Sequence, residues 1–268
     1  MNHAVIHHYH ARPVTIAEVR DITTDHPWKW LSEGWQDIKD APARSLGYGL
    51  GLTIVSYLVT LSVMVSGMFF LFPLLLAGFF LVAPILGIGL YGISRQLEMG
   101  ETPSLRAALR SAWHNSFNIL NMGVVLVVSL ILWVAVAQLI FALAFTGITP
   151  ATWQGFLTSL FGTWEGLQLL ALGISCGAVI AFLIYSMSAV STPMLMDSDC
   201  NVFDAIQTSW NAVRYNLLPM FLWAAMLVAI IAVGFMTLYV GLVILFPLAA
   251  HATWHAYRDL VKKTARSA

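Results

Sequence analysis

Long stretches without any charged side chain constrain this chain more than any other feature of its sequence. Residues 45–94, 111–164, 166–196 and 215–257 contain no Asp, Glu, Lys or Arg. A helix needs about 20 apolar residues to cross a bilayer, so the first and last stretches can each hold two crossings and the other two can hold one. We therefore predict an all-α polytopic membrane protein, with six transmembrane helices near 46–66, 69–93, 117–143, 168–193, 217–236 and 238–257.

The overall composition agrees with this class. The 268-residue chain is 59% hydrophobic and 10% charged, with a mean hydropathy of +0.79, whereas soluble domains carry about 25% charged residues. We predict a disordered polar tail at 1–25, a six-span membrane domain at 26–260 and a basic tail at 261–268. The first 44 residues have no basic segment followed by a short apolar one, so we expect no cleaved signal peptide.

The positions of the basic residues predict the orientation. All 13 Lys and Arg residues precede the first span, follow the last span, or lie between spans two and three or four and five. The segments on the opposite side carry one charge, Glu165. Because Lys and Arg concentrate on the cytoplasmic side, both termini are expected in the cytoplasm. A bacterial inner (cytoplasmic) membrane is the expected location.

Three short segments resemble one another when aligned on Trp35, Trp113 and Trp210. In the first and third, apolar residues recur at 28, 31, 35 and 38 and at 203, 206, 210 and 213. This spacing forms one stripe along a helix. We predict three cytoplasmic amphipathic helices in the membrane interface, each leading into a helical hairpin. The resulting threefold repeat has units of about 26–95, 103–195 and 201–258.

Several residues are predicted to anchor the protein at the two interfaces. The tryptophans of the three repeated segments are expected at the cytoplasmic headgroups, and Trp153 and Trp164 at the opposite interface. Arg95 and Arg258 end the second and sixth spans and are expected to anchor them. The pairs Gly47/Gly51 and Gly173/Gly177 predict close helix packing.

His251 and His255 are the strongest candidates for a binding site. They are four residues apart and share a helix face, but Ala252 stands where a zinc protease would need Glu. We expect both rings to contact backbone carbonyls or lipid headgroups; a proton-linked or metal-linked role is the alternative. We predict no catalytic residues, no metal site and no cofactor. An N-terminal histidine cluster is expected to belong to the disordered tail: His3, His7, His8 and His10.

Five segments are similar to a bacterial inner-membrane family catalogued as domain of unknown function 2189. They are GWQDIKDAPARSLGYGL, APILGIGLYGISRQLEMGETPS, PMLMDSD from Pro193, NLLPMFLW and PLAAHATWHAYRDL. The similarity covers roughly residues 26–262, and its last segment is the most specific. It implies membrane residence and six spans, and it implies no activity or site residues.

Two functions follow from these expectations. The first is an accessory, assembly or structural membrane component without catalytic machinery, in contact with the lipid bilayer and with other inner-membrane proteins. The second is a passive transporter or binder of an apolar or lipid-like ligand. Neither function involves nucleic acid. A closed bundle would favour the first, and a cavity open to the membrane would favour the second.

Overall fold

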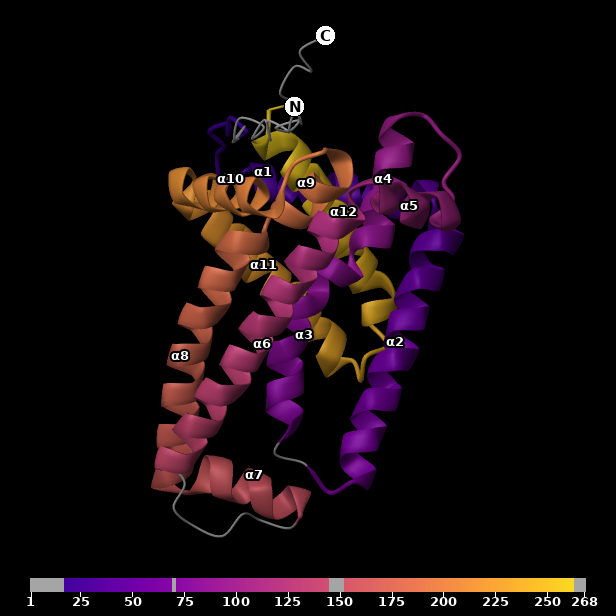
Figure 1. The fold of residues 1–268 in the computed structure, drawn as a ribbon. Helices are drawn as coiled ribbons and strands as arrows, with labels where there is room; N and C mark the ends of the chain where they lie inside the picture. The colour runs from indigo at the N-terminus through magenta and orange to yellow at the C-terminus, as the bar shows by residue number, and fades with distance from the viewer. Residues whose placement is uncertain (1–16, 69–70, 145–151, 263–268) are drawn as a thin grey trace, which may run out of the picture.

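A computed structural model describes residues 17–68, 71–144 and 152–262 as a bundle of helices (Figure 1). The only β-type pairing within these residues is an isolated bridge between Val19 and Val261. The predicted all-α class is therefore confirmed. In chain order, the helices are α1 (His26–Asp40), α2 (Pro42–Val65), α3 (Phe72–Leu86), α4 (Ile88–Glu98), α5 (Leu105–Ser111), η2 (Ala112–Asn115), α6 (Ser116–Ala144), α7 (Trp153–Gly162), α8 (Trp164–Ser188), α9 (Ser191–Asp197), α10 (Val202–Tyr215), α11 (Leu217–Met236) and α12 (Leu242–Leu260).

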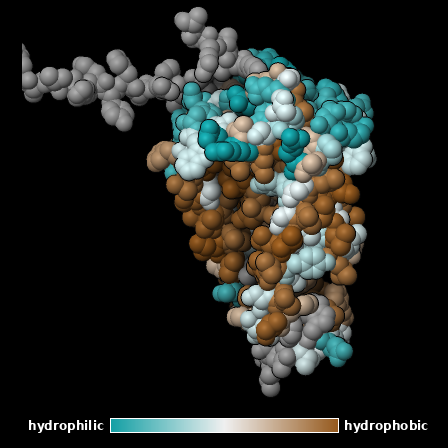
Figure 2. Space-filling view, turned by 90° about the vertical axis from the view of Figure 1, so that its right-hand side faces the viewer, coloured by the Kyte–Doolittle hydropathy of each residue, from teal (hydrophilic) through white to brown (hydrophobic). Residues whose placement is uncertain are grey.

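The helices are arranged along one long axis. The long helices α6 and α8 run side by side and both contact α3, and α2 runs along the same axis in contact with α12. α1 and α10 lie across one end, and α7 lies across the other (Figure 1). Hydrophilic side chains cover the end that carries α1 and α10, and a broad hydrophobic band follows below it (Figure 2). This end is called the polar end below. The arrangement fits a protein whose band faces lipid tails.

Five helical segments of the described chain are long and apolar enough to cross a membrane. They are Pro42–Val65, Gly78–Glu98, Leu105–Leu143, Trp164–Asp197 and Leu217–Met236. They correspond to the first five predicted spans. The sixth, predicted at 238–257, is not among them. Its helix, α12, is apolar only in its first half and carries His251, His255 and Arg258 in its second.

α12 is surrounded by other helices rather than by lipid, and more than half of its residues are buried. Small residues on its neighbours allow this. A Cβ at Gly34 of α1 would lie 2.6 Å from the backbone nitrogen of Ala252, and one at Gly49 of α2 would overlap the carbonyl of Val243. α12 therefore packs directly against the backbones of α1 and α2.

The predicted glycine pairs are only partly used for packing. A Cβ at Gly47 or Gly51 would meet no atom within 4 Å, so this predicted contact pair is wrong. The residue between them, Gly49, faces α12 instead. Of the second pair, Gly177 packs on the ring of Trp133, whereas a Cβ at Gly173 would meet nothing within 4 Å.

The buried face of the amphipathic helices lies one residue before the predicted stripe. In α1 the buried residues include Pro27, Trp30, Gly34 and Asp37. In α10 they include Val202, Ala205, Ser209 and Ala212. The aromatic residues of the predicted stripe point outward instead: Trp28, Trp35, Phe203 and Trp210 are exposed. The bundle therefore takes up mostly small residues of these helices together with Trp30, and Ile38 and Val213 of the predicted stripes are buried as well. The exposed aromatic rings can meet lipid.

The remaining predicted anchors share this exposure where they can be described. Trp113 in η2 and Trp164 at the start of α8 are both exposed, at 74% and 70%. Trp153 begins α7, which lies across the end opposite the polar one (Figure 1); its side chain lies outside the described residues. The N-terminal histidine cluster also lies outside them.

The turn between α11 and α12 is apolar and lies beside the middle of α2. The carbonyl of Leu238 accepts a hydrogen bond from the Tyr57 hydroxyl, and that of Tyr239 accepts one from Thr53 Oγ1 at 3.4 Å. Tyr57 is eight residues, about 12 Å, before the end of α2 at Val65. In Figure 1, α12 accordingly begins well short of α7. Hydroxyl groups of α2 thus supply the partners that non-helical backbone needs at membrane depth.

This geometry predicts that the turn does not reach the outer surface. In a background lacking Cys176 and Cys200, we expect Val240→Cys, whose native side chain is 63% exposed, to resist a water-soluble maleimide in intact and in permeabilised cells. A membrane-permeant apolar thiol reagent should label it. Glu165→Cys is the control and should react with the water-soluble reagent from one side. Labelling of position 240 in intact cells would instead support a complete sixth span.

Candidate functional site

A buried chain of hydrogen bonds joins four helices near the polar end, with His251 of α12 at its centre. The His251 ring is 0% exposed. Its Nε2 lies 2.9 Å from Ser45 Oγ in α2, and its Nδ1 lies 2.7 Å from Ser94 Oγ in α4. Ser94 Oγ in turn lies 2.5 Å from Asp37 Oδ2 in α1. Both ring nitrogens are therefore satisfied by side chains.

The acceptors fix the direction of the hydrogen bonds around the neutral ring. An ionised carboxylate can only accept, so the Ser94 hydroxyl donates to Asp37. Ser94 Oγ can then accept from His251 Nδ1–H. This places the ring proton on Nδ1 and leaves Nε2 to accept from the Ser45 hydroxyl. The network thus selects one tautomer of His251.

His255 extends this network towards the surface. Its Nε2 lies 2.9 Å from Asp37 Oδ2, and its Nδ1 lies 3.6 Å from Glu33 Oε2. We expected backbone carbonyls or headgroups as partners of both histidines, and that expectation is wrong. Serine hydroxyls and carboxylates from three other helices take those places. The helical periodicity around His251 carries no signal for them, because all of them lie on helices other than α12.

The order Ser45, His251, Ser94, Asp37 resembles a relay in which a histidine accepts the proton of a serine. A nucleophile must also reach a substrate, and Ser45 and His251 are both 0% exposed. The described residues contain no group of three or more His, Cys, Asp or Glu side chains that could hold a metal ion. In this geometry the network ties α1, α2, α4 and α12 together.

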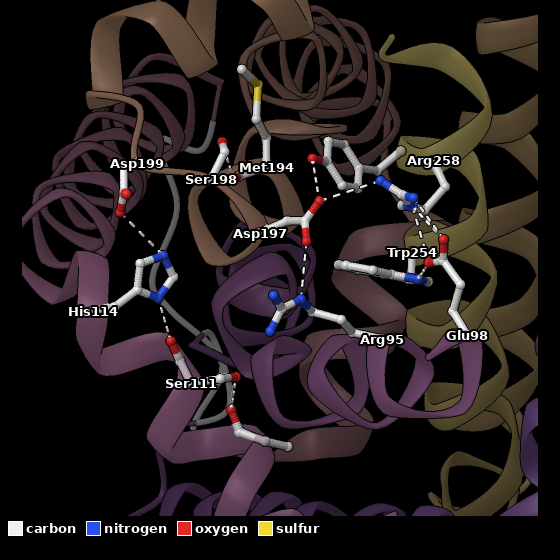
Figure 3. Close-up of polar contacts among 12 residues, drawn as sticks. Arg95, Glu98, Ser111, His114, Met194, Asp197, Ser198, Asp199, Trp254 and Arg258 are labelled. Carbon is white, nitrogen blue, oxygen red and sulfur yellow. Dashed lines mark hydrogen bonds and ion pairs between the residues drawn. The ribbon is translucent and has the colours of Figure 1, made fainter. Parts of the chain in front are cut away.

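A second cluster, formed by ion pairs, lies where α4, α9 and α12 end (Figure 3). Asp197 accepts from Arg95 Nε at 3.0 Å and from Arg258 Nη1 at 3.3 Å. Arg258 also binds Glu98, with Nη2 to Oε1 at 2.6 Å, and its guanidinium lies 5.9 Å from the centre of the Trp254 ring. Arg95 and Arg258 were predicted to anchor the ends of their helices at the interface, and the structure shows that both bind the carboxylate of Asp197.

The negative charges in this ion cluster stabilise the positive charge of Arg258. Burial opposes the charged form of Arg258, but hydrogen bonds and the charges of Glu98 and Asp197 outweigh it and raise the pKa of the guanidinium. Asp197 accepts a third hydrogen bond from the Tyr257 hydroxyl at 3.0 Å. The neighbouring Asp199 is much more exposed and reaches only His114, at 3.6 Å. Asp197 is therefore the carboxylate that connects the three helix ends.

A large apolar cavity lies below the ion cluster, within the hydrophobic band. Its volume is about 1120 Å³, and its walls come from α3, α4, α6, α7, α8, α11 and α12. Its lining includes no Asp, Glu, Lys, Arg or His. Aromatic rings form much of the wall: Phe80, Tyr91, Trp133, Phe141, Phe156, Phe182, Tyr185, Phe221 and Phe246. Sequence reasoning did not find this cavity, because an apolar residue that lines it has the same pattern as one that faces lipid.

Comparison with known families supports the class of protein that the fold defines, an integral membrane protein with several apolar helices. Residues 71–197 match the family described as "Predicted integral membrane protein (DUF2189)". The resemblance found in the sequence is thereby confirmed for this central part of the chain, from α3 to α9. No curated protein and no solved structure matches the chain significantly.

The ion cluster predicts unequal effects of two neighbouring substitutions. Asp197→Asn should destabilise the protein by about 1–3 kcal/mol, because it leaves two partly buried arginines with less compensation. Asp199→Asn is the matched control and should change stability by less than about 0.5 kcal/mol. The measurement is thermal unfolding in one mild detergent. Equal effects of the two substitutions would contradict a central role for Asp197.

The histidine network predicts coupling between α2 and α12. In a double-mutant cycle of Ser45→Ala and His251→Phe, the interaction free energy should be about 1 kcal/mol, because both partners are fully buried. Wild type and variants should contain no stoichiometric metal. Additive effects on the unfolding midpoint would show that the two side chains do not interact, and one metal per chain, lost in His251→Phe, would show a metal site.

Proposed function

We propose that this protein binds an apolar or lipid-like ligand inside its membrane domain, either as a passive transporter or as a binder. The cavity is the observation that carries this proposal. At about 1120 Å³ it is slightly larger than the usual range of ligand pockets, about 300–1,000 Å³. A bundle that served only as a structural component would have no need of such a space, because protein interiors are normally close-packed.

An accessory or assembly role is the second candidate. It is favoured by the exposed aromatic residues at the polar end, such as Trp28, Trp113 and Phe203, which a partner in the membrane could cover. An accessory role does not explain the cavity, so we rank ligand binding first. We also propose that the protein is not an enzyme, since both serines that contact His251, Ser45 and Ser94, are buried together with its ring.

We further propose a bacterial inner-membrane location with both termini in the cytoplasm. The described basic residues support this orientation. They lie in α1, the first turn of α2, α4, α5, α10 and the end of α12, or in the segments next to α1 and α12. These elements gather at the polar end (Figure 1), which the positive-inside rule assigns to the cytoplasm.

The threefold repeat also remains a proposal, with six membrane segments in three units. Burial at matched positions supports it. The residue five before each aligned tryptophan is fully buried (Trp30, Ala108 and Ala205), and the residue two after it is buried (Asp37, Asn115 and Ala212). Backbone breaks at Ala41 and Asn216 separate the first and third amphipathic helices from their spans. The middle unit continues through η2 instead.

Mass spectrometry of co-purified lipids tests ligand binding. Wild-type protein purified in mild detergent should retain a lipid-like molecule at a fixed ratio. Gly173→Trp should lower its amount about tenfold or more, because Gly173 lines the cavity and an added Cβ there meets no atom within 4 Å, so a large side chain at this position would occupy ligand space. Gly51→Trp is the matched control, since position 51 is equally open but lies outside the cavity. Equal retention in both variants would contradict the proposal.

A further inference from the structure

The shape of the cavity restricts what can occupy it, provided that the proposed function holds. Its wall on α8 extends from Leu169 to Ser188, and nineteen residues at about 1.5 Å each give a length of about 28 Å. This is close to the thickness of the hydrocarbon core, about 30 Å. The cavity is thus an elongated space that follows the long axis of the bundle.

The length of the cavity favours an elongated occupant. A compact ring system of the same volume would leave most of the length empty. An extended hydrocarbon chain suits both the length and the volume.

The chemistry of the wall restricts the charge of the ligand. None of the lining residues is charged, and an ionised group without a partner in such a space is strongly disfavoured. The wall does carry one amide, that of Gln138 in α6, an exposed side chain that forms no hydrogen bond with the other described residues. The nearby ring of Trp133 lines the same wall, and its Nε1 is buried without a partner.

The position of Gln138 indicates which end of the cavity receives a polar group. It lies 22 residues after the start of α6, about 33 Å from the polar end of that helix. Phe156 and Leu160 of α7 line the cavity too, and α7 crosses the end opposite the polar one (Figure 1). The amide is therefore available near the α7 end.

We propose that the ligand is a lipid with an extended hydrocarbon chain and an uncharged headgroup that can form hydrogen bonds, such as an alcohol or a carbonyl. The headgroup lies at the α7 end beside Gln138, and the chain extends towards the polar end. Lipids with charged headgroups are bound much more weakly inside the cavity.

Photolabelling of the full-length protein in neutral phosphatidylcholine vesicles tests this ligand class. The probes are a diazirine-bearing long-chain alcohol, the carboxylate with the same chain at pH 8, and a phosphatidylglycerol with the same diazirine. The alcohol should label α6 and α8 at cavity positions at least about tenfold more than either anionic probe. Gln138→Leu should weaken labelling by the alcohol about three- to tenfold. Gln168→Leu is the matched control, because Gln168 is exposed on α8 outside the lining.

The possible outcomes separate this inference from the proposed function. If an anionic probe labels the cavity as strongly as the alcohol does, the proposed ligand class is wrong, but the proposal of ligand binding stands. Equal effects of the two glutamine substitutions would overturn the assignment of the headgroup to Gln138. Both the inference and the proposed function would be overturned if none of the three probes labels cavity positions and if Gly173→Trp retains as much co-purified lipid as the wild type.

Discussion

The bridge that Asp197 forms between Arg95 and Arg258 holds together the polar ends of α4, α9 and α12. These three helices come from distant parts of the chain, and each carries its charge within its last turn. The Asp197 carboxylate lies between two guanidinium groups and accepts a hydrogen bond from each. The carboxylate of Glu98 provides a second negative charge beside Arg258. The position of α12 inside the bundle, and the cavity beneath the cluster, depend on this closure of the polar end.

The histidine network has a complementary role on the other side of α12. The ion cluster joins α12 to α4 and α9, whereas His251 and His255 join it to α1, α2 and α4. Polar groups that must leave water are costly unless each has a partner, so a network of this kind accepts few alternative arrangements. Together the two clusters define the rotation and depth of α12, and the apolar half of that helix then lines the cavity.

Much of the fold could be predicted because a membrane helix is recognised from the hydropathy of its own residues. Charge-free stretches located five of the spans, and the apolar stripe at 203, 206, 210 and 213 located α10. Other features depend on distant residues and have no local signal. The hydropathy of α12 cannot show that its polar half meets Asp37 and Ser94, and the outward direction of Trp35 depends on the small residue Gly34 meeting Ala252. Of the candidate site, the sequence predicted the two histidines but neither their partners nor the cavity.

The capping of the α11–α12 turn by α2 has a consequence for biosynthesis. The Leu238 carbonyl accepts from Tyr57, and the Tyr239 carbonyl accepts from Thr53 as well as from the backbone nitrogen of Leu242. Both hydroxyl donors belong to a helix that was synthesised nearly two hundred residues earlier. The last hairpin therefore gains its full set of backbone hydrogen bonds only when it packs against the first span.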